Sequence, residues 1–391
     1  MRLRGGLFSL ASIIMDLEDN IFMLAGPVKM HPRVLKAMSS PAINHRSAEF
    51  KAINAELREN LKYLFQTTTG QVALISGSGT AGLESVVSSL LHKKDRVLNL
   101  VNGKFSERFN DLCKVFADPN PMNFEWGKAV DPEKVAAELE KGDYRAVTLC
   151  HNETSTGVTN PAKDIATLAK KHDCLFILDG ITSVAGLEVK PDEWGADAVV
   201  MGSQKCIAAP AGLAGVMVSP RAYEELHEEQ SCYLSLRAHI DALRDEDDTP
   251  WTPAIPLFLA FREALRILKE ETIEGRIART AKLAKASRAA VDAMGLQLFP
   301  DKQCASNTLT AIRYPAGFDD GKFRKELRES HRVVVAGGQG SVKGKIFRIG
   351  HMGICPISDL LAAYAAVEAA MVKFGHKFER GAAVRAIAES Y

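Results

Sequence analysis

Between residues 72 and 220 the chain alternates short apolar runs with helical patterns, and this alternation restricts the possible folds more than any other feature. The helical patterns include "AGLESVVSSLLH" and "PAKDIATLAKKHD", in which apolar residues recur every three or four positions. Continuous apolar runs separated by helices indicate parallel strands that are buried on both faces. These runs are "VALIS", "RVLNLV", "RAVTLC", "CLFILDG", "DAVVMGS" and "AGVMVSP". We therefore predict an α/β domain whose chemistry lies at the carboxyl ends of its strands.

The pattern changes after the acidic segment "RDEDDTP". Two long helices are predicted, "IPLFLAFREALRILKEE" and "IEGRIARTAKLAKASRAAVDAMG", and the second ends at Gly295. Strand-like "TLTAIRYP", "RVVVAGG" and "IFRIG" follow, together with a helix at "DGKFRKELRES" and a last helix at "SDLLAAYAAVEAAMVKFG". We predict an N-terminal extension at residues 1–20, a large α/β domain at 21–270 and a smaller α+β domain at 271–391.

Composition excludes several classes of function. The 49 Lys and Arg residues nearly balance the 48 Asp and Glu residues, and no basic tract is present that could follow a nucleic acid backbone. No apolar run is long enough to span a membrane. The seven cysteines are odd in number and form no C-x-x-C pair, which favours a reducing, cytoplasmic location over disulfides or a metal site. The opening residues suggest an extended N-terminus with a true start at Met15.

One lysine ends a predicted buried strand, in "VVMGSQKCIAAPAGLAG". Lys205 lies there among small and apolar neighbours. Loss of hydration disfavours the ammonium form, so a neutral, nucleophilic amine becomes accessible. A Schiff-base lysine needs this property. Taken alone, the position also suits a lysine that reaches from a strand end into solvent.

A Gly/Ser/Thr turn lies between a predicted strand and helix, in "ISGSGTAGLES". Glycines allow close approach of a ligand, the helix N-terminus offers free N–H groups, and Ser78 and Thr80 add hydroxyls. The turn is predicted to bind an anion, and phosphate fits it best. Its glycines also fit G-x-G-x-x-G, the pattern of dinucleotide-binding folds, so a nicotinamide-dependent oxidoreductase is an alternative. Such a fold needs a carboxylate at the end of the next strand to hold a ribose, whereas that strand ends in Asn102, which disfavours this alternative. Phe105, just beyond it, suits either core packing or stacking on a flat ring.

A second strand end carries Asp179, in "CLFILDGITS". A buried carboxylate is costly unless a cation faces it, either in a structural salt bridge or as a protonated pyridine nitrogen. Lys205 follows at the end of the next predicted strand. An amine, a carboxylate and a phosphate site at neighbouring strand ends match the needs of pyridoxal phosphate.

The chain resembles the class V aminotransferases of fold type I, in the alanine–glyoxylate and serine–pyruvate aminotransferase branch. The resemblance runs from about residue 22 to residue 373. It rests on seven ordered motifs: "LAGPVKMHPRVLKAM", "SGSGTAGLE", "HNETSTGVTNP", "LDGITSVAG", "GSQKCIAAPAGLA", "TPWTPAIPLFLAFREAL" and "FRIGHMG". It implies a large domain with a mainly parallel, seven-stranded sheet and a smaller C-terminal α+β domain.

The resemblance also implies roles for individual residues. Lys205 would form the Schiff base with pyridoxal phosphate and then transfer protons, and Asp179 would pair with the ring nitrogen. Phe105 would stack on the ring, and Thr154 would bond its 3′ oxygen. The cofactor phosphate would contact Ser78, Gly79, Thr80 and Gln204 and, from the neighbouring subunit of a homodimer, Thr252 and Thr249.

The substrate would be held mainly by Arg348 of "FRIGHMG", whose guanidinium can grip a carboxylate with two hydrogen bonds. Gly26 would also lie at the substrate. The role of His45 and Arg46, near the expected entrance, stays open. The implied reaction moves the amino group of a small L-amino acid, alanine or serine, to glyoxylate or pyruvate by ping-pong kinetics.

Two alternatives belong to the same fold. One is a broad-specificity aminotransferase of the aspartate or phosphoserine type. The other is a lyase such as a cysteine desulfurase, which needs a mobile cysteine. The candidates are Cys232 and Cys304, and neither lies in a Gly/Ser/His-rich loop.

Overall fold

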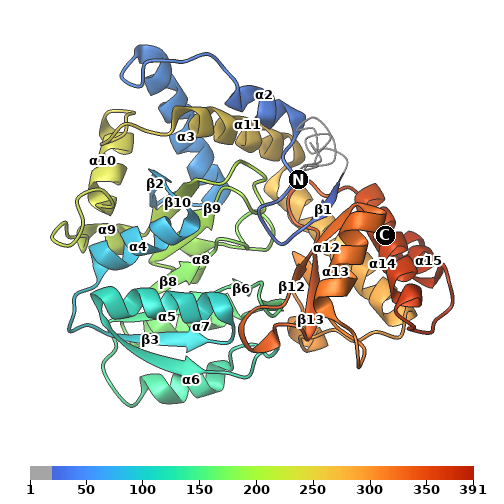
Figure 1. Ribbon diagram of the computed structural model, residues 1–391. Coiled ribbons are helices and arrows are strands. Elements are labelled where there is room, and N and C mark those ends of the chain that lie inside the picture. The colour runs from blue at the N-terminus through green and yellow to red at the C-terminus, as the bar shows by residue number, and fades with distance from the viewer. Residues whose placement is uncertain (1–19) are drawn as a thin grey trace, which may run out of the picture.

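The computed structural model describes residues 20–391 and contains two separate main sheets (Figure 1). Within these residues the larger sheet has seven strands in the order β2-β10-β9-β8-β5-β3-β4. Their bounds are β2 Gln71–Ser76, β3 Arg96–Val101, β4 Asp118–Asn123, β5 Ala146–Cys150, β8 Leu175–Asp179, β9 Ala198–Gly202 and β10 Leu213–Val218. All run parallel except β10, which is antiparallel to both of its neighbours, β2 and β9. The predicted mainly parallel α/β sheet is confirmed.

Helices cover both faces of this sheet, because alternate side chains of each strand enter different cores. In β8, Phe176 and Leu178 belong to the core that contains Ile165 of α7, whereas Ile177 belongs to the core that contains Phe109 of α5. The helices of this part are α2 Pro32–Met38, α3 Ala48–Phe65, α4 Gly79–Leu90, α5 Lys104–Phe116, α6 Pro132–Leu139, α7 Ala162–Lys171, α8 Pro191–Trp194, α9 Pro220–Glu224, α10 Leu236–Asp245 and α11 Ile255–Glu271. Continuous apolar strands therefore predicted the layering correctly.

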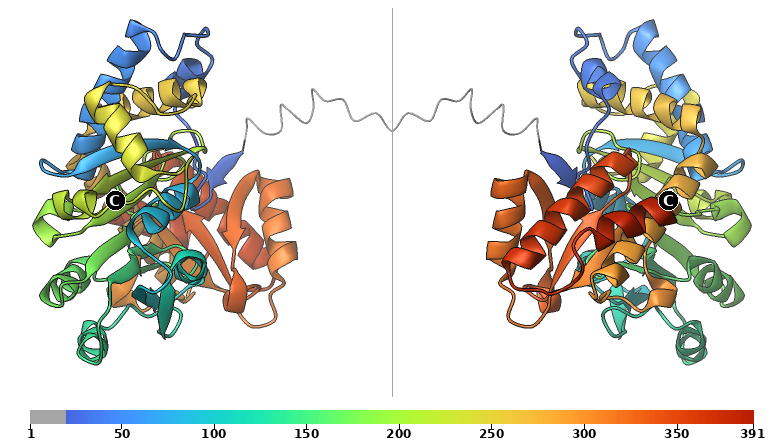
Figure 2. Two further views of the ribbon diagram at one scale, coloured as in Figure 1. Left: turned by 90° about the vertical axis from the view of Figure 1, so that its left-hand side faces the viewer. Right: turned by 90° about the vertical axis from the view of Figure 1, so that its right-hand side faces the viewer.

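The second sheet has four strands within the described residues, in the order β1-β12-β13-β11. The bounds of its strands and of its helices are β1 Ile21–Met23, β11 Leu309–Arg313, β12 Val333–Gly337, β13 Ile346–Gly350, α12 Ile273–Ala293, α13 Asp320–His331, α14 Ile357–Lys373 and α15 Ala382–Ser390. A separate core joins this sheet to its helices, with Phe323, Phe347 and Tyr364 fully buried. The C-terminal elements form a body of their own beside the larger sheet (Figure 2).

Three details differ from the sequence predictions. The predicted large domain begins at residue 21, but residues 21–23 form β1, which pairs in parallel with β12 of the smaller sheet. Helix α14 is not the last helix, since α15 follows it and packs against α12 and α14. Strand β4 was not predicted, because its sequence "DPNPMN" contains two prolines and little apolar character; it lies at the sheet edge, where proline is tolerated.

The predicted boundary between residues 270 and 271 falls near the junction of α11 and α12 and stays a prediction. The N-terminal extension and the start at Met15 concern residues 1–19, which lie outside the described residues. Among the helices of residues 20–391, none combines the length and apolar character needed to cross a bilayer. Two short strands, β6 Asn152–Glu153 and β7 Val158–Thr159, form a small hairpin beyond the end of β5.

Candidate active site

Lys205 lies three residues beyond the carboxyl end of β9 and points back toward the N-terminal segment. It is 9% exposed, and its Nζ donates a hydrogen bond of 2.8 Å to the carbonyl oxygen of Ala25. Burial lowers the pKa of Lys205 to about 8, because the desolvated ammonium is disfavoured. The Lys205 side chain can approach this segment so closely only because residue 26 is glycine: a Cβ there would lie 2.2 Å from Lys205 Cδ and 2.6 Å from its Nζ. The predicted desolvated amine is therefore present.

Asp179 is the last residue of β8, the strand that neighbours β9. The carboxylate is 6% exposed, and its Oδ1 accepts a hydrogen bond of 3.0 Å from the backbone N–H of Ile181. Burial raises the pKa of Asp179 to about 6; the nearby charge of Glu153 raises it further, and that of Lys205 lowers it. No ion pair reaches Asp179 from any residue between 20 and 391. A buried anion of this kind suits a cationic ligand atom.

The loop between β2 and α4 is the predicted anion cradle, and its contact with a phosphate stays a prediction. The N-cap residue of α4, Ser78, makes no capping hydrogen bond with its side chain. The first N–H groups of a helix have no intrahelical partner, so Gly79 and Thr80 present free donors there. At Gly79 a Cβ would lie 2.6 Å from Ile181 Cδ1, so a larger residue there would displace the Ile181 side chain.

One pocket brings together most of the predicted site residues. It contains Lys205, Asp179 and the cradle, and Phe105 and Gln204 as well. No sequence prediction covers the other residues that line it: Arg108, Cys150, Asn152, Ile181 and Thr182. Asn152 belongs to a recognised motif, whereas Arg108 could have been found as the residue one helical turn beyond Phe105; its guanidinium carbon lies 5.1 Å from the Phe105 ring centroid.

Arg348 is central in β13 and is 5% exposed. Its Nε and Nη2 donate to the carbonyl oxygen of Gly337, at 3.0 and 2.7 Å, and its Nη1 donates to that of Thr154, at 2.7 Å. A guanidinium has five N–H groups, so one remains free on each terminal nitrogen. Burial lowers the pKa of Arg348 to about 10, and the charge of Glu153 raises it. Arg348 is not among the residues that line the pocket.

Comparison with known proteins identifies the family. Residues 29–369 match the family model described as aminotransferase class-V. The chain is 41% identical over 365 residues to an uncharacterized aminotransferase of Methanocaldococcus jannaschii; the match covers 92% of this chain and 94% of that protein. It is 36% identical over 378 residues to a protein named as the small subunit of a soluble hydrogenase from Synechococcus sp.; the match covers 94% of this chain and 97% of that protein. It is 35% identical over 390 residues to the serine–glyoxylate aminotransferase of Methylorubrum extorquens, with 95% and 96% covered.

A solved structure agrees with these sequence relationships. The ureidoglycine–glyoxylate aminotransferase of Bacillus subtilis superposes with a TM-score of 0.92 at 33% sequence identity, with 95% of this chain and 98% of that chain covered. The chain belongs to the class V aminotransferases. Its fold is fold type I, and its cofactor is pyridoxal 5′-phosphate.

The pocket of this aminotransferase fits that cofactor. Asp179 offers a buried carboxylate without an ion-pair partner in the described chain, as a protonated ring nitrogen requires. The α4 N-terminus offers free donors for a phosphate. Within residues 20–391 nothing donates a hydrogen bond to the buried Oε1 of Gln204, so this side chain too is available to a ligand. Phe105 presents a flat aromatic face in the same pocket.

The contact of Thr154 with the cofactor ring stays a prediction. The side chain is buried but is not among those lining the pocket, and the backbone carbonyl of Thr154 holds Arg348. Asn152 and Thr182 line the pocket instead, and Asn152 Nδ2 donates to Thr182 Oγ1 at 3.0 Å.

Thr249 and Thr252 lie outside the pocket of their own chain. Thr249 Oγ1 donates to the carbonyl of Trp251, and Thr252 is exposed. Arg46 holds this segment, because its Nη1 contacts both Asp248 Oδ1 and the Thr249 carbonyl oxygen at 2.6 Å. No sequence motif assigns a role to Arg46. The half-buried His45 still has none.

The alternative chemistries gain no support from the site. The exposed Cys232 and the half-buried Cys304 do not line the pocket, and burial raises the pKa of Cys150, which does, well above its ordinary value. Asn102 is buried and bonds Asn160, so it packs the sheet end. A cysteine desulfurase from Thermococcus onnurineus shares the fold, with a TM-score of 0.73 at 12% identity.

Only one group of potential metal ligands occurs within residues 20–391, formed by His92, His227 and Glu229 away from the pocket. The two imidazole rings are stacked, with centroids 4.0 Å apart and planes 17° apart. Lone pairs in nearly parallel planes do not converge on one ion, so this arrangement is not a formed metal site. The prediction that the protein uses no metal remains untested.

Proposed function

We propose that this aminotransferase moves the amino group of a small L-amino acid, alanine or serine, to glyoxylate or pyruvate in a ping-pong cycle. The observation that carries the proposal is the joint placement of the Lys205 amine, the Asp179 carboxylate and the α4 cradle around one pocket. The relatives named for glyoxylate as acceptor support the choice of oxo acid. In such a cycle the first oxo acid leaves before the second binds.

Lys205 is the proton carrier of the proposed reaction. Its pKa of about 8 lets the amine exist in both forms near neutral pH, so it could take the proton from the substrate α-carbon, deliver it to the aldehyde carbon of the cofactor, and move it the opposite way in the second half-reaction. When bound, pyridoxal phosphate supplies a carbonyl for the substrate amine and a ring that accepts electrons from the α-carbon. Asp179, charged above pH 6, holds the proton on the ring nitrogen.

Arg348 is the proposed site for the substrate carboxylate. Two backbone carbonyls fix the guanidinium, and the remaining N–H groups on its two terminal nitrogens can form a two-point grip. Every amino acid and oxo acid of the cycle carries this carboxylate. The residue therefore serves both half-reactions, while the side-chain pocket selects the donor.

A panel of half-reactions tests the donor and acceptor. Purified enzyme is mixed with alanine, serine, aspartate or phosphoserine, and the cofactor absorbance is followed; the acceptors glyoxylate, pyruvate and 2-oxoglutarate are then compared. Among the donors we expect alanine or serine to give the largest second-order rate constant. Among the acceptors we expect glyoxylate or pyruvate to do so. A preference for aspartate or phosphoserine would overturn this choice in favour of the broad-specificity alternative. Arg108 would explain such a result, since it lines the pocket and forms no ion pair in the described chain.

We also propose that the enzyme is a cytoplasmic homodimer with shared active sites. Seven free cysteines support a reducing compartment. Tyr233 and Trp251 support an interface, because they stack on each other and are 49% and 37% exposed. Thr252 lies next to Trp251 and outside the pocket of its own chain, so in such a dimer it would contact the active site of the partner subunit.

Subunit complementation tests the shared site. Lys205→Ala removes the amine, and Thr252→Glu places a negative charge where the partner's phosphate would lie. If sites are shared, a mixed dimer combines the intact Lys205 of one chain with the intact Thr252 of the other, and one of its two sites recovers. If exchange is demonstrated and no activity returns, the shared site is refuted.

A further inference from the structure

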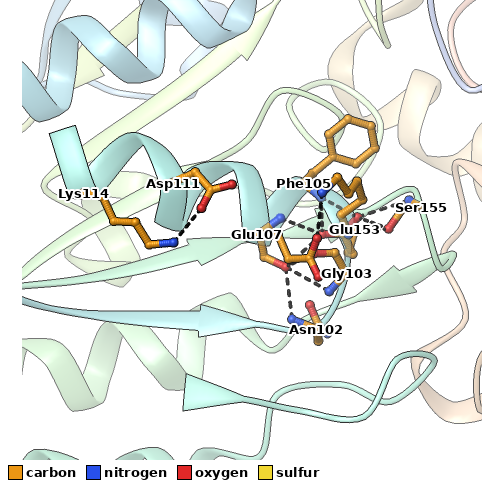
Figure 3. Close-up of polar contacts among 10 residues, drawn as sticks. Asn102, Gly103, Phe105, Glu107, Asp111, Lys114, Glu153 and Ser155 are labelled. Atoms are coloured by element: carbon orange, nitrogen blue, oxygen red, sulfur yellow. Dashed lines mark hydrogen bonds and ion pairs between the residues drawn. The ribbon is translucent and has the colours of Figure 1, made fainter. Parts of the chain in front are cut away.

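Glu153 is a fully buried carboxylate that lies outside the pocket, directly behind the residue expected to face the cofactor. It belongs to the short strand β6 and is 0% exposed. Its side chain reaches the first turn of α5, the helix that carries Phe105 (Figure 3). An isolated charge buried this deeply would be strongly unfavourable, so its partners indicate what it does.

The carboxylate oxygens of Glu153 are saturated with donors. Backbone N–H groups of Phe105 and Ser106 donate to Oε2 at 3.0 and 2.8 Å, and Ser106 Oγ does so at 3.0 Å. On the other side, the N–H and hydroxyl of Ser155 donate to Oε1 at 3.2 and 2.5 Å. Backbone N–H groups can only donate, so the ionised carboxylate, which only accepts, is the form that satisfies them. Its charge also complements the positive end of the α5 dipole.

The surrounding chain is built to admit this side chain. At Gly103 a Cβ would lie 2.3 Å from Glu153 Cγ and 2.4 Å from its Cδ. Any larger residue would push the carboxylate away from the helix. Glycine at this position therefore allows Glu153 to bond the backbone of Phe105 itself rather than a more distant part of α5.

The next residue along the chain connects the same segment to the substrate side. The carbonyl oxygen of Thr154 accepts the 2.7 Å hydrogen bond from Arg348 Nη1. The charge of Glu153 also raises the pKa of both Arg348 and Asp179. One short turn thus contacts the ring-facing helix and the arginine proposed to bind substrate.

We propose that Glu153 is a positioning residue for the cofactor: its carboxylate fixes the backbone at Phe105 and so sets the aromatic face against which the ring stacks. This inference rests on the proposed function, in particular on the stacking of Phe105 on the ring. Glu153 contacts neither cofactor nor substrate and acts through Phe105. Both carboxylate oxygens contact the backbone N–H of Phe105, Oε1 at 3.3 Å and Oε2 at 3.0 Å, so in either orientation of a glutamine amide the NH2 group faces that N–H and displaces the helix start.

The experiment is a double-mutant cycle on cofactor binding. The variants Glu153→Gln, Phe105→Ala and the combination are compared with the unmodified enzyme for the dissociation constant of pyridoxal phosphate and for the visible circular dichroism of the bound cofactor. Glu107→Gln is the matched control, because Glu107 carries the same charge in the first turn of α5 but contacts Lys104 and is partly exposed.

We expect Glu153→Gln to weaken cofactor binding by about tenfold and to reduce the visible dichroism, and Glu107→Gln to change neither. Residues that act through one another are non-additive, so the double variant should bind no more weakly than Phe105→Ala alone. Independent, multiplying losses would overturn the proposal. An unaltered dichroism in Glu153→Gln would overturn it as well.

Two further measurements keep the outcomes distinct. If Glu153→Gln does not fold, Glu153→Asp replaces it, because aspartate retains the charge on a shorter side chain. This variant should fold and bind the cofactor more tightly than Glu153→Ala, and equal binding by the two variants would refute a role for the charge. If the proposed function itself fails, the unmodified enzyme shows no amino transfer with any donor of the panel, while the binding cycle can still be measured.

Discussion

Replacement of Gly26 by alanine tests the geometry at Lys205 most directly. The added Cβ would lie 2.2 Å from Lys205 Cδ, whereas ordinary contact begins near 3.4 Å. The lysine side chain would therefore shift by more than about 1 Å, and a misplacement of about 1 Å in an active site costs on the order of a hundredfold in rate. Since the contacted atoms belong to a flexible side chain, the fold should tolerate the change.

Backbone strain provides the matched control. Gly26 has φ +94°, and Gly375 has φ +86° with no atom within 4 Å of an added Cβ. Both alanine variants should lose about 1–2 kcal/mol of unfolding free energy, which is the cost of a left-handed backbone at a residue with a side chain. Only Gly26→Ala should lose turnover. Thermal unfolding and steady-state kinetics of the two variants measure this, and equal kcat values would refute the steric argument.

Three further predictions concern the titrating and binding groups. In the cofactor-free protein, alkylation of Lys205, measured by mass spectrometry, should increase as the pH rises through about 8, and a midpoint near 10.4 would contradict the burial effect. The free energy of unfolding should rise between pH 8 and the ordinary lysine pKa of about 10.4, because in that range the unfolded chain binds a proton that the folded chain has lost. Asp179→Asn keeps the volume but removes the charge, so the rate should fall far more than cofactor affinity, and equal losses would make Asp179 a structural anchor. Arg348→Lys should cost about 1.5–3 kcal/mol of substrate binding, roughly tenfold to a hundredfold in the apparent constants of donor and acceptor alike, and a defect confined to the donor would refute the shared grip.

The sequence predicted best those parts of the site that depend on local pattern. Lys205 and Asp179 each follow an apolar run, and parallel neighbouring strands bring their carboxyl ends to one edge. The cradle at Ser78 was predictable for the same reason, since it needs only a strand, a turn rich in small residues and a helix. Each of these features is encoded by one short stretch of neighbouring residues, so a local pattern is enough to recognise it.

Contacts between distant segments could not be predicted in this way. Nothing in "HNETSTG" indicates that Glu153 bonds the backbone of Phe105, because that contact depends on the register of two separate strand ends. Arg46 gained its role only when the fold placed it beside Asp248. Strand β1 is three residues long and joins the smaller sheet through pairing with β12, which a short apolar pattern does not specify.

The pairing of β1 with the smaller sheet connects that sheet directly to the segment that contacts Lys205. Only one residue separates Met23, the end of β1, from Ala25, the hydrogen-bond acceptor of Lys205. Gly350 of β13 lies against the same short segment, since a Cβ there would be 2.3 Å from the carbonyl oxygen of Leu24. A displacement of the smaller sheet would therefore also move this segment, and with it the carbonyl oxygen that accepts the hydrogen bond from Lys205.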